Sequence, residues 1–206
     1  MRSLVWVSAQ LVAWIAFLRC AGVLVALARQ GLRRKNTKIT QWGWTENLAA
    51  PEPFLMVAFA YLLSRGSTPD GGVSAVQAGL AITGCILATL GLAVWVWGFA
   101  TIPSLSSGHY ILPKQELITT GAFRFVRHPI YLGVFLLWMA LAAASASIMI
   151  LVVAITYVIP VYLLYIRSEE RMMLAHFGAS YRAYQAHTGM ILPRLRKHAS
   201  RQGGTM

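Results

Sequence analysis

The chain contains a run of 37 residues without a charged side chain, from Ile130 to Ile166. A single helix of this length would measure about 55 Å, whereas the hydrocarbon layer of a bilayer is about 30 Å thick. The run therefore has to fold back on itself as a helical hairpin. We expect its turn in the stretch 142–147, which reads Ala-Ala-Ala-Ser-Ala-Ser.

The composition is that of a membrane protein. Of the 206 residues, 57% are hydrophobic and 12% are charged, whereas a soluble domain carries about 25% charged residues. We predict an all-α integral membrane helical bundle, and the length favours a single domain over 1–206. Cys20 and Cys85 both lie in apolar segments, so we expect neither a disulfide nor a metal site.

Three further apolar segments can cross the bilayer. Leu4–Ala28 and Val73–Ile102 are long enough, and Leu4–Ala28 is too long for the core of a signal peptide. Phe54–Leu63 is short, but the helix can begin near Leu48 because proline is tolerated in a first turn. With the two arms of the hairpin, these segments predict about five transmembrane helices.

Arg19 lies inside the first span, where a charge either faces a cavity or snorkels to the membrane surface, and we expect it to snorkel.

The basic residues predict the orientation. They concentrate in segments 29–47 and 101–129 and in the tail from Arg167 onward. The positive-inside rule places all three on the cytoplasmic side, which requires Phe54–Leu63 to cross the membrane. The N-terminus is then outside, and the C-terminal helical segment is cytoplasmic. A net charge of +12 would favour nucleic-acid binding in a soluble protein, but here we expect contact with anionic lipid and no nucleic-acid partner.

Two segments with unusual polar residues flank the hairpin. We call 115–131 the first polar segment and 169–184, on a helix leaving the last span, the second. Because a helical hairpin begins and ends on the same membrane face, both should meet at one cytoplasmic mouth. Glu169 and Glu170 are the one adjacent acidic pair. They are either a solvated helix start beside basic neighbours or the partners of a positively charged ligand.

His128 stands at the boundary of a span, between Arg127 and Pro129. A residue before proline is disfavoured in helical geometry, so His128 should lie at a turn. A lone histidine is more often structural, and Tyr131 alone would be an ordinary residue of the aromatic belt. Their grouping with Arg127 favours a functional role.

In these two segments the chain resembles the isoprenylcysteine carboxyl methyltransferase family and, more loosely, the membrane phospholipid N-methyltransferases. The similarity runs from about Gln115 to Pro193, and the first 100 residues share only their apolar spans. Gln115 stands where the family often has histidine, and Phe123 where it usually has tyrosine. The matching motifs are 117–121 (Leu-Ile-Thr-Thr-Gly), 127–133 (Arg-His-Pro-Ile-Tyr-Leu-Gly), Glu169-Glu170, Phe177-Gly178, Tyr181 and Tyr184.

The resemblance implies a cytoplasmic site for S-adenosylmethionine and a lipophilic methyl acceptor that enters from the bilayer. It divides the chain into N-terminal spans, 1–102, and a cofactor-binding region, 103–206, which contains the hairpin 130–166. Catalytic roles are expected for Arg127, His128 and Tyr131. The residues implied in cofactor binding are Gln115, Glu116, Leu117, Ile118, Phe123, His128, Pro129, Ile130, Tyr131, Glu169 and Glu170.

The charges of S-adenosylmethionine fit these residues. The cofactor carries a sulfonium, an ammonium and a carboxylate; Glu169 and Glu170 can pair with the ammonium, and Arg127 with the carboxylate. A carboxylate acceptor needs no general base, whereas for a thiol, phenol or amine His128 is the candidate.

Two other functions stay open at this point. One is an NADPH-dependent membrane reductase of sterol type, which shares a similar Arg-His-Pro region. The other is a non-catalytic accessory protein with the same fold. The acceptor also stays open between an isoprenylcysteine carboxylate and another lipophilic molecule.

Overall fold

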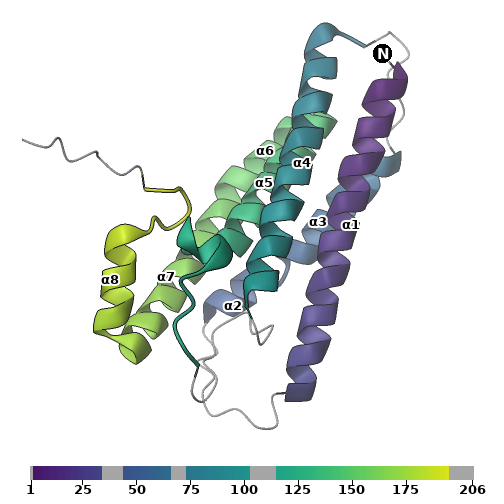
Figure 1. Cartoon of the computed structure of the whole chain (residues 1–206). Coiled ribbons are helices and arrows are strands. Elements are labelled where there is room, and N and C mark those ends of the chain that lie inside the picture. The colour runs from purple at the N-terminus through teal and green to yellow at the C-terminus, as the bar shows by residue number, and fades with distance from the viewer. Residues whose placement is uncertain (1, 34–43, 66–72, 103–114, 195–206) are drawn as a thin grey trace, which may run out of the picture.

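A computed structural model describes residues 2–33, 44–65, 73–102 and 115–194 of the chain (Figure 1). Over these ranges the regular elements are all helical, as predicted. They are α1 (Arg2–Arg33), α2 (Trp44–Ala49), α3 (Glu52–Arg65), α4 (Ala75–Thr101), η2 (Gly121–Arg124), α5 (Pro129–Ser145), α6 (Ile148–Val153), η3 (Ala154–Val158), α7 (Ile159–Phe177) and α8 (Ala179–His187).

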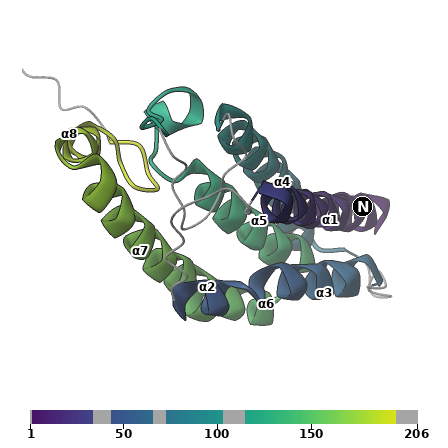
Figure 2. The same cartoon turned by 90° about the horizontal axis from the view of Figure 1, so that it is seen from below.

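Four helical segments are long and apolar enough to cross a membrane: Val5–Val25, Asn47–Arg65, Ala75–Thr101 and Ile148–Phe177. The fifth apolar helix, α5, is shorter. In the view from below, α5 lies between α4 and the row formed by α6 and α7 (Figure 2). The doubtful segment Phe54–Leu63 lies within the 19 residues of Asn47–Arg65, so it is long enough to span the hydrocarbon layer.

The hairpin turns inside the stretch predicted for it. Helix α5 ends at Ser145, and Ala146 adopts the left-handed conformation with φ of 48°. The side chain of Ser147 then accepts a hydrogen bond from the backbone N–H of Ile150 and caps α6. From there the chain stays helical to Phe177, with one π turn just before Pro160, where the missing proline N–H disturbs the regular ladder.

Glycines bring α4 and α5 into close contact. A Cβ atom at Gly133 would lie 2.7 Å from the backbone oxygen of Gly91 and 2.8 Å from Cβ of Trp95. Small residues at helix interfaces allow such backbone approach inside membranes. At the end of α4, Thr101 lies against Gly121, whose φ is +57°. This contact anchors the first polar segment to the bundle.

Arg19 does not snorkel, so that prediction is wrong. Its side chain is 3% exposed and forms an ion pair with Glu52, with 2.9 Å between Nη1 and Oε2. A carboxylate at the start of α3 provides a partner within the bundle, which removes the reason for the guanidinium to reach the membrane surface.

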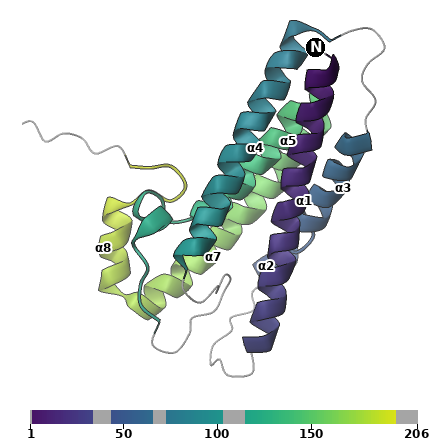
Figure 3. The same cartoon turned by 45° about the vertical axis from the view of Figure 1, so that its right-hand side comes forward.

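The helix that leaves the last span is broken at Gly178. This residue has φ of +55°, a conformation that glycine adopts readily and that commonly ends helices. The chain reverses there, and α8 lies beside the segment that contains η2 (Figure 3). The second polar segment is therefore two helices rather than one.

Candidate functional site

The segment that follows α8, residues 188–194, holds the first polar segment in place, and we call it the C-terminal segment. Its carbonyl oxygens at Gly189 and Met190 accept hydrogen bonds from the backbone N–H groups of Arg127 and His128, at 2.8 and 3.0 Å. His128 is the N-cap of α5, followed by Pro129 at the first helical position. The predicted turn at His128 is thus present, and backbone contacts fix it.

Arg127 joins three elements around the site. Its Nε and Nη2 atoms lie 2.8 and 2.7 Å from Oε1 of Glu170 on α7. Its Nη1 atom donates to the carbonyl oxygens of Gln185 on α8 and Thr188 just beyond it. The Arg127 side chain is only 9% exposed. A planar guanidinium can make all these contacts at once, which a lysine cannot.

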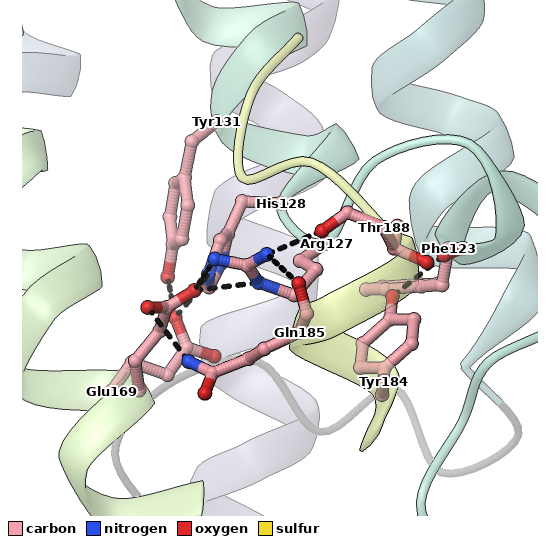
Figure 4. A network of polar contacts seen from close by, with 9 residues as sticks. Phe123, Arg127, His128, Tyr131, Glu169, Tyr184, Gln185 and Thr188 are labelled. Atoms are coloured by element: carbon pink, nitrogen blue, oxygen red, sulfur yellow. Dashed lines mark hydrogen bonds and ion pairs between the residues drawn. The ribbon is translucent and has the colours of Figure 1, made fainter. Parts of the chain in front are cut away.

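His128 lies near the carboxylate of Glu169, as Figure 4 shows, and also contacts the carboxylate of Glu170. Its Nε2 atom is 3.1 Å from Oε1 of Glu170, and its Nδ1 atom is 3.8 Å from Oε2 of Glu169. Glu170 also accepts a hydrogen bond of 3.2 Å from the side-chain amide of Gln185. The imidazole is buried, so its orientation is set by these groups.

Tyr131 holds the second carboxylate. Its hydroxyl donates to Oε2 of Glu169 over 2.8 Å. Its ring stacks on His128 and contacts Tyr162 and Tyr165 of α7, with centroids 5.4 to 5.8 Å apart. The hydrogen bond and the ring contacts together fix the position of Glu169 from the side of α5.

These groups border a pocket of about 610 Å³, its open mouth included. One wall comes from α4 and the first polar segment, and the opposite wall from α7 and α8. Its lining residues are Ile102, Gln115, Leu117, Ile118, Phe123, Arg127, His128, Glu169, Met172, Met173, Tyr181 and Tyr184.

The structure brings the two polar segments together, as the hairpin predicts. Of the residues implied in cofactor binding, six line the pocket, and the expected catalytic residue Arg127 lines it too; the six are Gln115, Leu117, Ile118, Phe123, His128 and Glu169. Pro129, Ile130, Tyr131 and Glu170 lie behind this lining, and Glu116 is exposed. Their roles toward a cofactor stay predictions.

The sequence gives no role in the site to five lining residues, although Tyr181 and Tyr184 belong to the motifs of the resemblance. Met172 and Met173 follow Glu169 by three and four positions, and this helical spacing was a readable signal for the same face of α7. Tyr181 and Tyr184, three positions apart on α8, repeat that pattern. The fifth is Ile102, at the end of α4.

Tyr184 stays protonated over a wide pH range. Burial raises the pKa of its phenol above the usual value, against the opposing effect of Arg127. Its hydroxyl donates a 2.6 Å hydrogen bond to the backbone oxygen of Phe123. This bond connects α8 to η2. Because the acceptor is the backbone oxygen of residue 123, the bond does not depend on whether that residue is phenylalanine or the tyrosine usual in the family.

Among the residues that the structure describes, no group of three or more His, Cys, Asp or Glu side chains is arranged to hold a metal ion. The charged side chains that line the pocket are those of Glu169 and Arg127, with the imidazole of His128 beside them. Such a site can bind an organic molecule that carries positive charge.

The known proteins reported below, which are similar to this chain in sequence, are named as methyltransferases. The sequence model of the family described as "Phospholipid methyltransferase" matches residues 80–180. The chain is 37% identical over 81 residues to "Methanethiol S-methyltransferase 2" of Bradyrhizobium diazoefficiens, covering 39% of this chain and 30% of that protein. It is 31% identical over 131 residues to "Methanethiol S-methyltransferase" of Pseudomonas deceptionensis, covering 56% and 49%.

A third relative is "Protein-S-isoprenylcysteine O-methyltransferase" of Saccharomyces cerevisiae, 30% identical over 122 residues, covering 54% of this chain and 48% of that protein. The chain thus spans less than half the length of each of these relatives. The region matched by the family model contains α5, α7 and the residues Arg127, His128, Tyr131, Glu169 and Glu170. Over residues 80–180, slightly less than half of the chain, the sequence is thus similar to the phospholipid methyltransferase family, and it is also similar to an isoprenylcysteine O-methyltransferase.

Proposed function

We propose that this chain is an integral membrane methyltransferase that uses S-adenosylmethionine and methylates an apolar acceptor reaching the site from the bilayer. In this proposal the pocket opens on the cytoplasmic face, where the basic segments place it. The cofactor supplies a methyl group already activated on a sulfonium. The protein's task is then to bind the cofactor, align the acceptor and exclude water.

The proposal rests on a difference between the groups that contact the two carboxylates. Glu170 is compensated by Arg127 at 2.7 Å and by His128 at 3.1 Å. Glu169 lines the pocket; among the described residues it accepts a hydrogen bond from the neutral hydroxyl of Tyr131, and His128 lies farther away at 3.8 Å. A carboxylate held beside an open pocket with a neutral donor favours a cationic ligand.

The residues present fit S-adenosylmethionine. Glu169 would hold a cationic part of the cofactor, and Leu117, Ile118 and Phe123 offer apolar surface for the adenosine. Arg127 holds Glu170 and the C-terminal segment, so in this arrangement its guanidinium is a positioning group rather than a partner for the cofactor. Tyr131 positions Glu169 in the same way from α5.

His128 is the group able to accept a proton. For a thiol, phenol or amine acceptor, it would take the proton released on methylation, and its contact with Glu170 fixes the ring. A carboxylate acceptor would leave His128 with a positioning role. The names of the relatives cover both chemistries, an S-methyltransferase for methanethiol and an O-methyltransferase for isoprenylcysteine. For this chain we propose a lipophilic acceptor without choosing between them.

A ligand panel tests the proposal against its alternatives. The purified protein is heated in detergent with S-adenosylhomocysteine, with NADPH or without ligand, and its unfolding temperature is recorded. We expect S-adenosylhomocysteine to raise the unfolding temperature and NADPH to leave it unchanged, since binding to the native state stabilises it. A shift with NADPH alone would support the reductase, and a shift with neither ligand would support an accessory protein.

A further inference from the structure

A second polar cluster lies inside the bundle, away from the pocket. Its centre is Glu52, which is 0% exposed. The carboxylate accepts hydrogen bonds from Arg19 of α1 at 2.9 and 3.2 Å, from Nε1 of Trp138 at 2.7 Å and from the hydroxyl of Tyr162 at 2.9 Å. One side chain thus joins α1, α3, α5 and α7. We call these four residues the Glu52 cluster.

The Glu52 cluster is in register with the candidate site. On α5, Trp138 follows Tyr131 by seven residues, and on α7, Tyr162 precedes Glu169 by seven residues. Seven helical residues correspond to two turns, or about 10 Å along the axis. Helices α5 and α7 are therefore linked twice, by the Tyr131–Glu169 bond at the pocket and through Glu52 about 10 Å deeper.

The two links also touch each other. The ring of Tyr162, whose hydroxyl is held by Glu52, packs against the ring of Tyr131 with centroids 5.4 Å apart. Tyr131 in turn holds Glu169. A shift of the Tyr162 ring would therefore be passed on to the carboxylate that lines the pocket, because closely packed interiors transmit displacements.

Stability alone does not explain a buried ion pair. Placing two charges inside a protein is costly, and apolar residues of similar volume often serve stability equally well. Glu52 fixes how α5 and α7 lie relative to each other, because its two oxygens accept hydrogen bonds from Trp138 on α5 and Tyr162 on α7. We infer that Glu52 is a positioning residue of the cofactor site, which sets the place of Glu169 through Tyr162 and Tyr131. The inference rests on the proposed function.

The test removes one hydroxyl and keeps the ring. Tyr162→Phe breaks the bond to Glu52, whereas the control Tyr157→Phe, five residues earlier, breaks the 2.7 Å bond from Tyr157 to the backbone oxygen of Leu48. Both variants lose one hydrogen bond to the α2–α3 region. We measure the affinity for S-adenosylhomocysteine by calorimetry, the unfolding temperature, and hydrogen exchange of peptides covering 165–173 in the ligand-free protein.

We expect Tyr162→Phe to lose at least fivefold in affinity and to exchange faster over 165–173, while Tyr157→Phe keeps the wild-type affinity and exchange there. Similar unfolding temperatures of the two variants would show that the difference is not general destabilisation. Equal affinity and exchange in both variants would overturn the inference. If the wild-type protein binds no S-adenosylhomocysteine, the proposed function fails, and the exchange over 165–173 alone decides whether the Glu52 cluster positions Glu169.

Discussion

The hydroxyl of Tyr131, in the first turn of α5, donates a 2.8 Å hydrogen bond to Oε2 of Glu169 on α7. It connects the beginning of one arm of the hairpin to the end of the other. If the proposed function holds, this bond positions the carboxylate that faces the cofactor. Four predictions follow from this arrangement and from the packing behind it, and the last measurement tests the carboxylate itself.

Replacing Tyr131 with phenylalanine should weaken cofactor binding while the fold is kept. The ring contacts with His128 and Tyr162 remain, but Glu169 loses its donor. Hydrogen bonds to charged groups contribute about 1.5 to 3 kcal/mol, so we expect the affinity for S-adenosylhomocysteine to fall about tenfold. Calorimetry measures this, with Tyr61→Phe on the exposed face of α3 as control. Unchanged affinity would show that the bond does not position the ligand-binding carboxylate.

Arg127→Lys should loosen the C-terminal segment. A lysine keeps the charge near Glu170 but cannot also reach the carbonyl oxygens of Gln185 and Thr188. We expect faster proteolysis in the segment 185–194 and weaker binding of S-adenosylhomocysteine. The matched control is Arg182→Lys on the exposed face of α8. Equal cleavage rates in both variants would contradict the role given to Arg127.

The contact between α4 and α5 predicts that alanine substitutions at two glycines affect the free energy of unfolding differently. A Cβ at Gly133 would lie 2.7 Å from a backbone oxygen, whereas one at Gly79 would meet nothing within 4 Å. Overpacking typically costs about 1 to 3 kcal/mol, so Gly133→Ala should lower the free energy of unfolding by about this amount. Gly79→Ala should leave it unchanged or raise it, because alanine favours the helix. Denaturant titration in micelles measures both, and a stable Gly133→Ala protein would argue against the close packing.

The ion pair in the Glu52 cluster predicts a non-additive pair of substitutions. Arg19→Met alone leaves the buried Glu52 carboxylate without its cation, and losing one partner of a buried pair costs about 3 to 5 kcal/mol. In the double variant Arg19→Met/Glu52→Gln no charge remains, so we expect most of the loss in the free energy of unfolding to be recovered. A double variant as unstable as the sum of the single variants would contradict the pairing.

The sequence was sufficient for the parts of the fold that depend on the length of apolar runs. The uncharged run Ile130–Ile166 required a hairpin, and the hairpin required its two ends to meet. The acidic pair at 169–170 and the residues around His128 were therefore predictable neighbours. Glycine after a helix commonly ends it, so the helix break at Gly178 could also be predicted from the sequence.

Other contacts could not be predicted because they depend on three-dimensional partners. Glu52 lies at the start of an apolar run beside two prolines, where a glutamate usually faces solvent. Nothing in its surroundings points to Arg19, 33 residues earlier, or to Tyr162, 110 residues later. The segment around Gly189 holds Arg127 and His128 through backbone groups, which leave no mark in a residue pattern.

The most direct measurement is the binding of S-adenosylhomocysteine to the purified protein and to its Glu169→Gln variant, by calorimetry in detergent. The variant keeps an oxygen that can accept from Tyr131 but loses the negative charge at the pocket. We expect the wild-type protein to bind and the variant to bind at least about tenfold more weakly, while Arg182→Gln, an exposed change on α8, binds as the wild type does. Equal affinity in wild type and Glu169→Gln, or no binding by the wild type, would contradict the account.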